Sequence, residues 1–263
     1  MTSATAPNLA RIPAGEFLMG AADAEHDERP VHRVFVGEFF IGRFPVTNDE
    51  YARFVRATGH PSPAVRGLPL ITVGGRDGIF RELAAPYVWD GDQPPPGHGA
   101  HPVVLVRYDD ALAYCRWLSN QIDRAVRLPT EAEWEKAARA GGDVGRRYPW
   151  GDEIDPSHGN FLSEGTIKRQ RGTRPTGTYP PNAYGLYDVI GNVWEWVSDW
   201  YDAEYYALAD LRDPKGPDAG NMRIVRGGSW VNDDVSMLRC AYRHKVPPDT
   251  YAYSVGFRVV CGS

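Results

Sequence analysis

The stretch NAYGLYDVIGNVWEWVSDWY, residues 182–201, constrains the fold more than any other part of the chain. Its aromatic residues gather on both sides of a Gly-Asn turn at Gly191 and Asn192. The whole sequence of 263 residues has the same character, with 8 Trp and 14 Tyr beside 28 Gly and 22 Pro. This composition predicts a compact, loop-rich fold in which aromatic side chains supply the burial that regular elements cannot supply.

The same stretch carries a candidate metal site. Asp188 and Glu195 lie on either side of the turn and offer carboxylates, while Gly191 and Val193 offer backbone carbonyls. Calcium binds six to eight oxygens of these two kinds, so we predict a structural calcium ion held by these four residues. The alternative is that Glu195 caps the turn and the neighbouring tryptophans fill the core.

Three helices are predicted from local signals. Thr47 and Glu50 form one capping box, and Thr130 and Glu133 form another, so a helix is expected to follow each threonine. A third helix is predicted over residues 108–121, where two aspartates in the first turn favour the positive end of the helix dipole. Gly141 and Gly142 are expected to stop the helix that follows Thr130.

The rest of the chain is predicted to contain short strands and loops. Residues 11–19 and 31–41 alternate like strands, with Val34 and Val36 on one face and Phe35 on the other. Residues 61–101 are rich in Pro and Gly and read as a long surface insertion. Residues 143–263 read as short strands, turns and aromatic clusters, and we expect one domain over residues 1–263.

Charge and hydropathy exclude several classes of protein. The net charge is -5 and the longest basic run is the four residues 168–171, so we expect no nucleic-acid partner. No apolar run is long enough to cross a membrane, and the N-terminus does not resemble an export signal. Three cysteines form an odd, sparse set that fits a reducing compartment. We therefore expect a cytoplasmic protein with no membrane partner.

Eight sequence blocks occur in an order that identifies a family. They are FLMG, PVTNDEYARF, HPVVLVRYDDALAYCRWL, RLPTEAEWEKAARAG, YPWGDE, NAYGLYDVIGNVWEWVSDWY, RGGSW and GFRVV. Over about residues 10–262 the chain resembles the formylglycine-generating enzyme (sulfatase-modifying factor) family. The resemblance implies an α+β, C-type-lectin-like fold with little regular secondary structure. It also implies a calcium ion in the segment that contains Asp188 and Glu195.

The resemblance leaves the activity open, because the family includes oxidases and non-catalytic binding proteins. Its best-known oxidase converts a sulfatase cysteine to formylglycine with a copper ion held by two thiolates. Here the corresponding segment, residues 231–238, reads VNDDVSML and has no cysteine. Asn232 stands at the first thiol position, and Ser236 or Met237 near the second. We therefore expect no copper and no catalytic residue, and we expect Cys240 to be a buried structural cysteine.

The sequence offers two further candidate metal sites, one for iron and one for a second calcium ion. His98 and His101 lie three residues apart in a Gly/Pro-rich loop, but no helical histidine motif for iron is present. Each histidine is therefore read as structural or solvated, and an iron enzyme would need a site that the spacing does not provide. The family's second calcium site would place Lys168 where an acidic ligand is expected, so we predict no ion there.

The C-terminal segment, residues 226–260, supports a binding role. It keeps the fixed frame RGGSW…R.A.R…PD…GFRVV that resembles the variable proteins of diversity-generating retroelements. Tyr and short polar residues between the frame positions are typical of adaptable binding surfaces. We predict that an unknown protein or small-molecule ligand contacts these positions, and the alternative is a divergent metal-dependent oxidoreductase of the family. The predicted contact residues are Val231, Asn232, Asp233, Val235, Ser236, Tyr242, His244, Val246, Thr250, Ala252, Tyr253 and Ser254.

Overall fold

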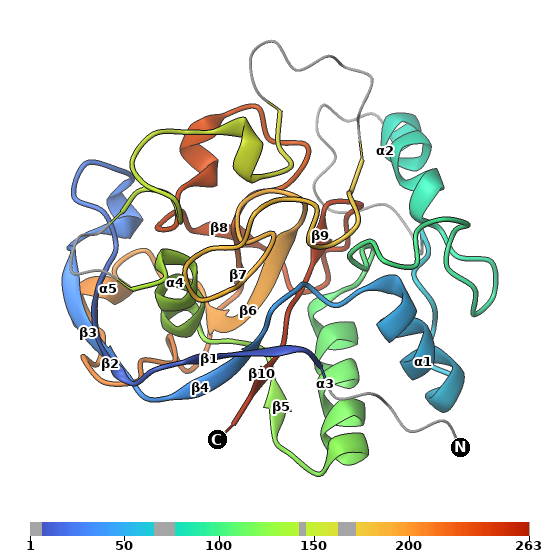
Figure 1. Cartoon of the computed structure of the whole chain (residues 1–263), viewed down its shortest axis with the longest axis horizontal. Helices are drawn as coiled ribbons and strands as arrows, with labels where there is room; N and C mark the ends of the chain where they lie inside the picture. The colour runs from blue at the N-terminus through green and yellow to red at the C-terminus, as the bar shows by residue number, and fades with distance from the viewer. Residues whose placement is uncertain (1–6, 66–76, 142–145, 163–171, 263) are drawn as a thin grey trace.

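The computed structural model describes residues 7–65, 77–141, 146–162 and 172–262 (Figure 1). Helices α1, α2 and α3 lie together on one side of the molecule, and the hairpin of β2 and β3 lies with α5 on the other. Strands β6, β7 and β9 lie between these two groups (Figure 1). Short helices and short strands joined by long loops give an α+β fold with little regular structure, as the composition predicts.

The helices begin where the sequence predicts. Thr47 and Glu50 form the capping box of α1, and Thr130 and Glu133 form that of α4. Ala140 is the C-cap of α4, with a left-handed backbone conformation at φ 53°, and it lies one residue before the predicted glycine stop. The α-helices are α1 (Asn48–Thr58), α2 (Asp77–Ala84), α3 (Tyr108–Ile122), α4 (Glu131–Arg139) and α5 (Tyr205–Leu208). The 3-10 helices are η1 (His26–Glu28), η3 (Ala85–Tyr87), η4 (Pro156–His158) and η5 (Val235–Leu238).

The described strands form three small sheets. One has the order β1-β4-β10-β5, another pairs β2 with β3, and the last has the order β8-β7-β6-β9. In the last sheet β6 and β9 are parallel, while its other neighbours are antiparallel. The strands are β1 (Leu9–Ile12), β2 (Gly15–Met19), β3 (His32–Val36), β4 (Phe39–Gly42), β5 (Val126–Arg127), β6 (Trp194–Trp200), β7 (Arg223–Arg226), β8 (His244–Val246), β9 (Val255–Gly256) and β10 (Val260–Cys261).

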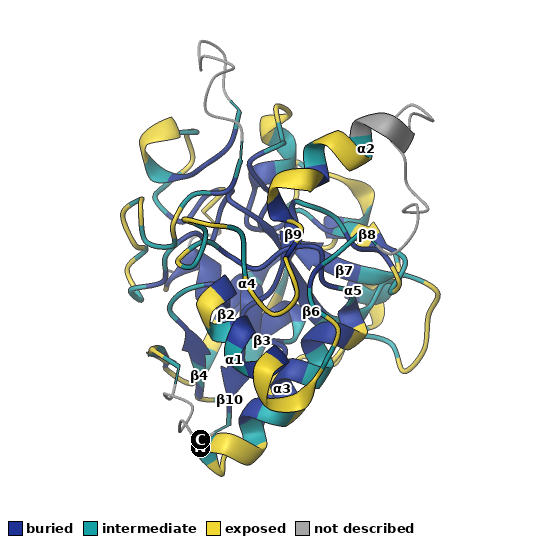
Figure 2. Cartoon of the chain, turned by 90° about the vertical axis from the view of Figure 1, so that its right-hand side faces the viewer, coloured by how far each residue is buried: buried dark blue, intermediate teal, exposed yellow. Residues whose placement is uncertain are grey.

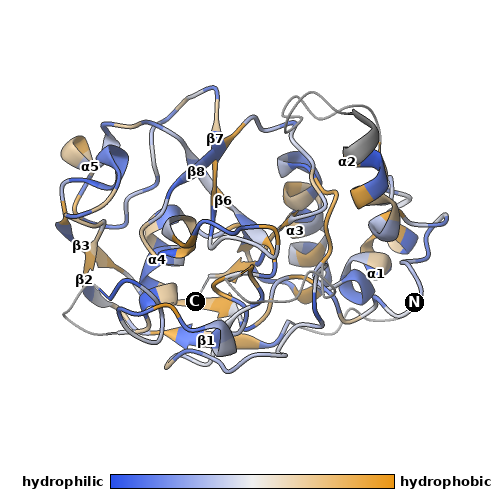
Figure 3. Cartoon of the chain, turned by 90° about the horizontal axis from the view of Figure 1, so that it is seen from above, coloured by the Kyte–Doolittle hydropathy of each residue, from blue (hydrophilic) through white to orange (hydrophobic). Residues whose placement is uncertain are grey.

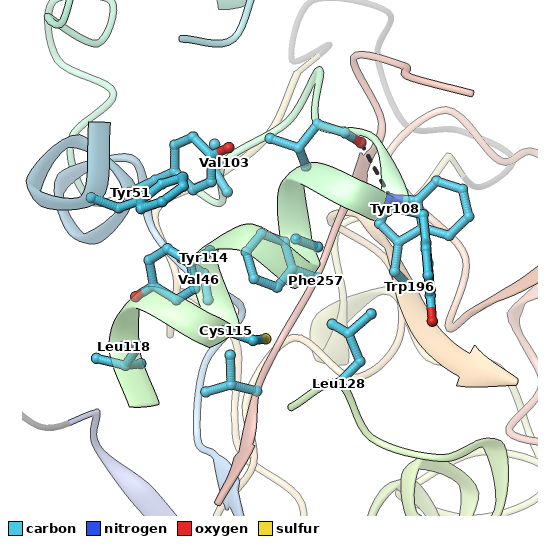
Figure 4. Close-up of a cluster of buried hydrophobic side chains, with 14 of the residues drawn as sticks. Val46, Tyr51, Val103, Tyr108, Tyr114, Cys115, Leu118, Leu128, Trp196 and Phe257 are labelled. Carbon is cyan, nitrogen blue, oxygen red and sulfur yellow. Dashed lines mark hydrogen bonds between the residues drawn. The ribbon is translucent and has the colours of Figure 1, made fainter. Parts of the chain in front are cut away.

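The core is built mainly from aromatic and β-branched side chains. Figure 2 shows the strands buried and the outward faces of the helices exposed, and Figure 3 shows hydrophobic and hydrophilic residues alternating along α3. In the close-up of Figure 4, Tyr51, Tyr114 and Phe257 pack together, and Trp196 donates a hydrogen bond to the carbonyl oxygen of Val106 at 3.2 Å. Cys115 lies within this cluster, as its position on the apolar face of α3 predicts.

The insertion at residues 61–101, predicted as a long surface insertion without strong periodicity, contains regular structure and buried aromatic residues. It contains α2 and η3, and Tyr87 and Trp89 are both buried. Phe80 of α2 packs on Tyr251 and Tyr253, with ring centroids 6.1 and 5.5 Å apart. The insertion is therefore held by aromatic contacts with the C-terminal segment, which local composition does not reveal.

Candidate functional site

A hollow of about 550 Å³ opens between two segments that are far apart in the sequence. Residues 25–27, at the start of η1, form one wall, and residues 242–245, at the start of β8, form the other. Tyr201, which directly follows β6, lines the same hollow. Its size falls in the range of ligand-binding clefts in proteins.

Tyr201 joins the two walls through a chain of hydrogen bonds. Its hydroxyl donates to Asp27 Oδ2 at 2.7 Å and accepts from Lys245 Nζ at 2.8 Å. Burial and the neighbouring Asp27 carboxylate raise the pKa of this phenol well above its usual value. The hydroxyl therefore stays protonated at neutral pH and serves as a fixed polar group in the hollow.

His244 contributes an apolar ring surface to the hollow. Its ring stacks on the buried indole of Trp194, with centroids 4.9 Å apart and planes 29° from parallel. Burial, and then the charge of Lys245, lower the pKa of His244. The imidazole is therefore neutral at neutral pH and offers a flat face and a nitrogen for hydrogen bonding.

Buried ion pairs hold the two walls in place. Arg243 contacts both carboxylate oxygens of Glu131 on α4, at 2.9 and 3.0 Å, and donates to the carbonyl oxygens of Asp27 and Asp202. Arg239 likewise pairs with Glu28 of η1, through Nη2 and Oε1 at 2.8 Å. Arg243 lines the hollow and Arg239 does not, and their ion pairs fix the position of the wall that carries Tyr242 and His244.

The structure separates the predicted contact residues into groups. Tyr242 and His244 line the hollow. Val231 and Tyr253 pack beside Trp230 under the insertion, and Ala252 packs against the main core. The group Asp233, Val235 and Ser236 lies at the solvent side around the start of η5.

Three of the predicted contact residues are buried, which corrects their placement at the surface. Val246, Thr250 and Ser254 have 4, 6 and 8% of their surface exposed. Val246 belongs to the main core cluster, and the carbonyl of Ser254 accepts a hydrogen bond from Trp194 N at 2.8 Å. In a segment with few regular strands, alternation along the sequence does not tell inward from outward side chains.

Asn232 and Met237 contact each other at the place where the family oxidase has its two thiols. Asn232 Nδ2 lies 3.2 Å from the thioether sulfur of Met237. Asn232 Oδ1 accepts from the backbone nitrogen and the hydroxyl of Ser229, both at 2.9 Å. The amide therefore stabilises a turn, and it contacts Met237, one of the two residues that the resemblance places near the second thiol position.

The cysteines of the chain are all buried and unpaired. Cys240 has 0% of its surface exposed, and burial raises its pKa to about 12. Burial also raises the pKa of Cys115 to about 12, with a smaller contribution from nearby Cys261. A thiol is nucleophilic or metal-binding as the thiolate, so Cys240 is a structural residue, as the sequence predicts.

The carboxylates predicted to bind calcium have protein hydrogen-bond donors. Both oxygens of Glu195 accept from Arg258, at 2.6 and 2.7 Å, and Oε2 also accepts from Trp134 Nε1 at 2.8 Å. Asp188 Oδ2 accepts from the backbone nitrogen of Gly177 at 2.8 Å, and burial raises the pKa of this carboxyl to about 6. Glu195 is therefore an ion-pair partner of Arg258 rather than a cap of the turn.

A calcium ion fits this segment if backbone carbonyls supply most of its oxygen ligands. Oε1 of Glu195 accepts a single hydrogen bond and keeps a lone pair for one further contact. An ion beside it would take most of its oxygens from backbone carbonyls, such as those of Gly191 and Val193. Calcium at this position stays a prediction. The predicted absence of a second ion concerns Lys168, which lies outside the described residues.

With the geometry in hand, comparison with known proteins identifies the family. A family model described as "Sulfatase-modifying factor enzyme 1-like domain" matches residues 1–262. The chain belongs to this family. It is 39% identical over 284 residues to the formylglycine-generating enzyme of Streptomyces coelicolor, covering 94% of this chain and 87% of that protein.

Two other relatives bear different names. The inactive C-alpha-formylglycine-generating enzyme 2 of Bos taurus is 34% identical, covering 97% of this chain and 88% of its own length. The serine/threonine-protein kinase pkn1 of Chlamydia caviae is 38% identical over 95% of this chain, which spans only 37% of that kinase. Membership of the family therefore does not by itself decide the activity.

Solved structures confirm the predicted fold. PvdO from Pseudomonas aeruginosa superposes with a TM-score of 0.78 at 30% identity, covering 98% of this chain and 95% of that one. Treponema denticola variable protein 1 superposes with a TM-score of 0.72 at 23% identity, covering 97 and 95%. This chain therefore has the α+β, C-type-lectin-like fold that the resemblance implies. In the part of the chain that the structure describes, no helix is long and apolar enough to cross a bilayer.

One wall of the hollow is not predictable from local sequence. Residues 25–27 carry three polar, ionisable side chains in a row, but nothing local relates them to the C-terminal segment. Tyr201 and Lys245, which also line the hollow, carry no local signal of a site. The run of acidic residues and histidine at residues 25–28 is the sequence signal that points to this wall.

Proposed function

We propose that this chain is a non-copper member of the family that binds a protein or small-molecule ligand through its C-terminal loops. The observation that carries the proposal is that residues 231–238 contain no cysteine, and that Asn232 contacts Met237 within this segment. An amide and a thioether cannot form the bis-thiolate that holds copper in the family oxidase. The name of the Bos taurus relative, an inactive formylglycine-generating enzyme, is consistent with such a loss.

The hollow beside Tyr242 and His244 is the proposed ligand site. It combines flat ring surfaces with a fixed hydroxyl and an ammonium group, at Tyr201 and Lys245. Aromatic side chains give large contact areas at low entropic cost, while the polar groups fix the orientation of a ligand. Exposed Asp233 and Val235, with half-buried Ser236, offer a second group of contact residues on the same C-terminal segment.

Selection of displayed random peptides on the purified protein tests the binding role. We expect selected peptides to bind the wild type and to bind the triple variant Tyr242→Ala, His244→Ala, Tyr253→Ala at least about tenfold more weakly, because rings are removed from the predicted surface. Peptides that bind both proteins equally would place the ligand elsewhere. A melting curve separates this loss from unfolding.

A peptide oxidation assay separates binding from the alternative, a divergent oxidoreductase like the relatives named formylglycine-generating enzymes. The protein is incubated in air, so that dioxygen is the oxidant, with Cu(I), a thiol reductant and a cysteine-containing sulfatase peptide, and the peptide mass is followed. We expect no conversion of the cysteine, and conversion would establish the alternative.

The narrower proposal, a retroelement variable protein, predicts a reverse-transcriptase gene and a near-identical template repeat in the flanking DNA.

A further inference from the structure

His98 and His101 are brought together by two successive turns in the insertion. His98 N donates to the carbonyl of Pro95 and His101 N donates to that of His98, both at 3.0 Å. The two imidazole rings lie with centroids 4.5 Å apart and planes tilted by 48°. Both side chains are half-buried, so solution can reach them.

The loop that carries the two histidines is anchored on the N-terminus of α1. Asn48 donates through its backbone nitrogen to the carbonyl of His101 and through Nδ2 to that of His98, both at 2.9 Å. Asp49 N donates to the carbonyl of Gly99 at 2.9 Å. The spacing of the rings is therefore set by the backbone rather than by a ligand.

Hydrogen bonds at Nδ1 orient both rings. His98 Nδ1 lies 3.2 Å from the carbonyl oxygen of Pro96, which can only accept, so Nδ1 carries the proton. His101 Nδ1 lies 2.9 Å from the hydroxyl of Thr173. In the described chain neither Nε2 atom has a hydrogen-bond partner. A histidine that binds a metal through Nε2 commonly has its other nitrogen held by an oxygen in this way.

Water completes the coordination of an ion at this pair. Among the described residues no group of three or more His, Cys, Asp or Glu is placed to hold a metal ion, so the protein supplies two ligands here and water supplies the others.

The ring spacing lets both histidines reach one ion. A metal–nitrogen bond of 2.0–2.1 Å places an imidazole centroid about 3.2 Å from the ion, so two rings with centroids 4.5 Å apart can bind the same ion once both Nε2 atoms turn toward it. A site of two imidazole nitrogens and water oxygens suits Cu²⁺ or Ni²⁺, which bind nitrogen ligands more tightly than the earlier divalent metals of the series do. We propose that His98 and His101 bind one Ni²⁺ or Cu²⁺ ion as neighbouring ligands, at a site separate from the hollow.

Calorimetric titration of the intact protein with NiCl₂ tests the site. We expect one equivalent of Ni²⁺ to bind, and His98→Ala or His101→Ala to weaken binding by at least about tenfold. Thr173→Val keeps both ligands but removes the hydroxyl that orients His101, so it should weaken binding by about tenfold as well. The electron paramagnetic resonance spectrum of the Cu²⁺-loaded protein should show two nitrogen ligands, and one of them should be lost in His101→Ala.

His158→Ala is the matched control, because His158 is also partly exposed and has its Nδ1 held by Asp155 at 2.9 Å, but its ring stacks on Trp150 rather than beside a second histidine. It should bind Ni²⁺ like the wild type. Equal affinity of the wild type and His98→Ala, or an equal loss in His158→Ala, would overturn the proposal. Melting curves of the metal-free proteins check that each variant is folded before the titrations are compared.

Discussion

Replacement of Arg226 by methionine tests how the buried ion pairs support the fold. Arg226 has 0% of its surface exposed and donates to Glu131 and Glu135 of α4 at 2.6 and 2.7 Å. It also donates to the carbonyls of Cys240 and Ala241, at the start of the segment that leads to the hollow. Methionine has a similar length and no charge, so it removes the interactions without leaving a large cavity.

The expected cost follows from the charges left behind. After the replacement, Glu135 still pairs with Arg139 and Glu131 still pairs with Arg243. The buried cluster of charges has nevertheless lost one positive charge, and the carbonyls of Cys240 and Ala241 have lost their hydrogen-bond donor. Removing one partner of a buried ion pair costs about 3–5 kcal/mol of unfolding free energy. For a chain of this size that corresponds to a fall in Tm of roughly 6–20 °C.

Urea denaturation followed by circular dichroism measures this loss at pH 7. Arg11→Met is the control, because the Arg11–Glu38 pair is exposed and screened by solvent, so its loss should change the unfolding free energy far less. A loss in Arg226→Met no larger than that of the control would refute the reasoning. It would show that the buried carboxylates are stable without this guanidinium.

The pH dependence gives a second readout of the same change. Burial raises the pKa of Glu135, but Arg139 and Arg226 lower it by more, so the native pKa lies below the usual value. A lowered carboxyl pKa stabilises the native state above the unfolded pKa of about 4.5, and this contribution is lost as pH falls through the native pKa. Without Arg226 the pKa of Glu135 rises. The difference between the wild type and the variant should therefore shrink as pH falls below about 4.5, and a constant difference in that range would contradict this account.

Three shorter predictions concern other groups. If calcium is bound beside Glu195, EDTA should lower the Tm by several degrees and added Ca²⁺ should restore it; an unchanged melting curve would speak against the ion. Burial, and then Glu131, raise the pKa of Asp199 to about 7, so its stabilising contribution is complete below pH 4 and is lost as pH rises to 7. Wild type should therefore lose about 1–3 kcal/mol more unfolding free energy than Asp199→Asn between pH 5 and pH 8, and parallel pH profiles would refute this. The three buried cysteines should react with a thiol reagent at pH 8 only after denaturation, and fast labelling of the native protein would contradict their burial.

Local signals in the sequence were sufficient for α1 and α4, because a capping box such as Thr47 with Glu50 satisfies the helix end within four residues. The α2 helix was not predictable in this way. Its eight residues give a short pattern, and Phe80 finds its partners on Tyr251 and Tyr253, about 170 positions further along the chain.

Only one of the two walls of the hollow was predictable from the sequence. The family frame pointed to Tyr242 and His244, but the opposite wall, residues 25–27, comes from the other end of the described chain. Neither composition nor periodicity relates segments more than 200 residues apart. For Glu195, the sequence showed a carboxylate beside a turn, but its partner Arg258 is set by the tertiary fold.

The place of β10 has a consequence for how the protein is made. Val260 of β10 pairs with Ile41 of β4 on one side and with Arg127 of β5 on the other. During synthesis these two strand edges therefore lack their common neighbour until Val260 has been translated, more than 130 residues after Arg127 of β5. Contacts between such distant residues form slowly, and strand edges left open in the meantime favour aggregation. We expect the nascent chain to depend on chaperones until β10 closes the sheet.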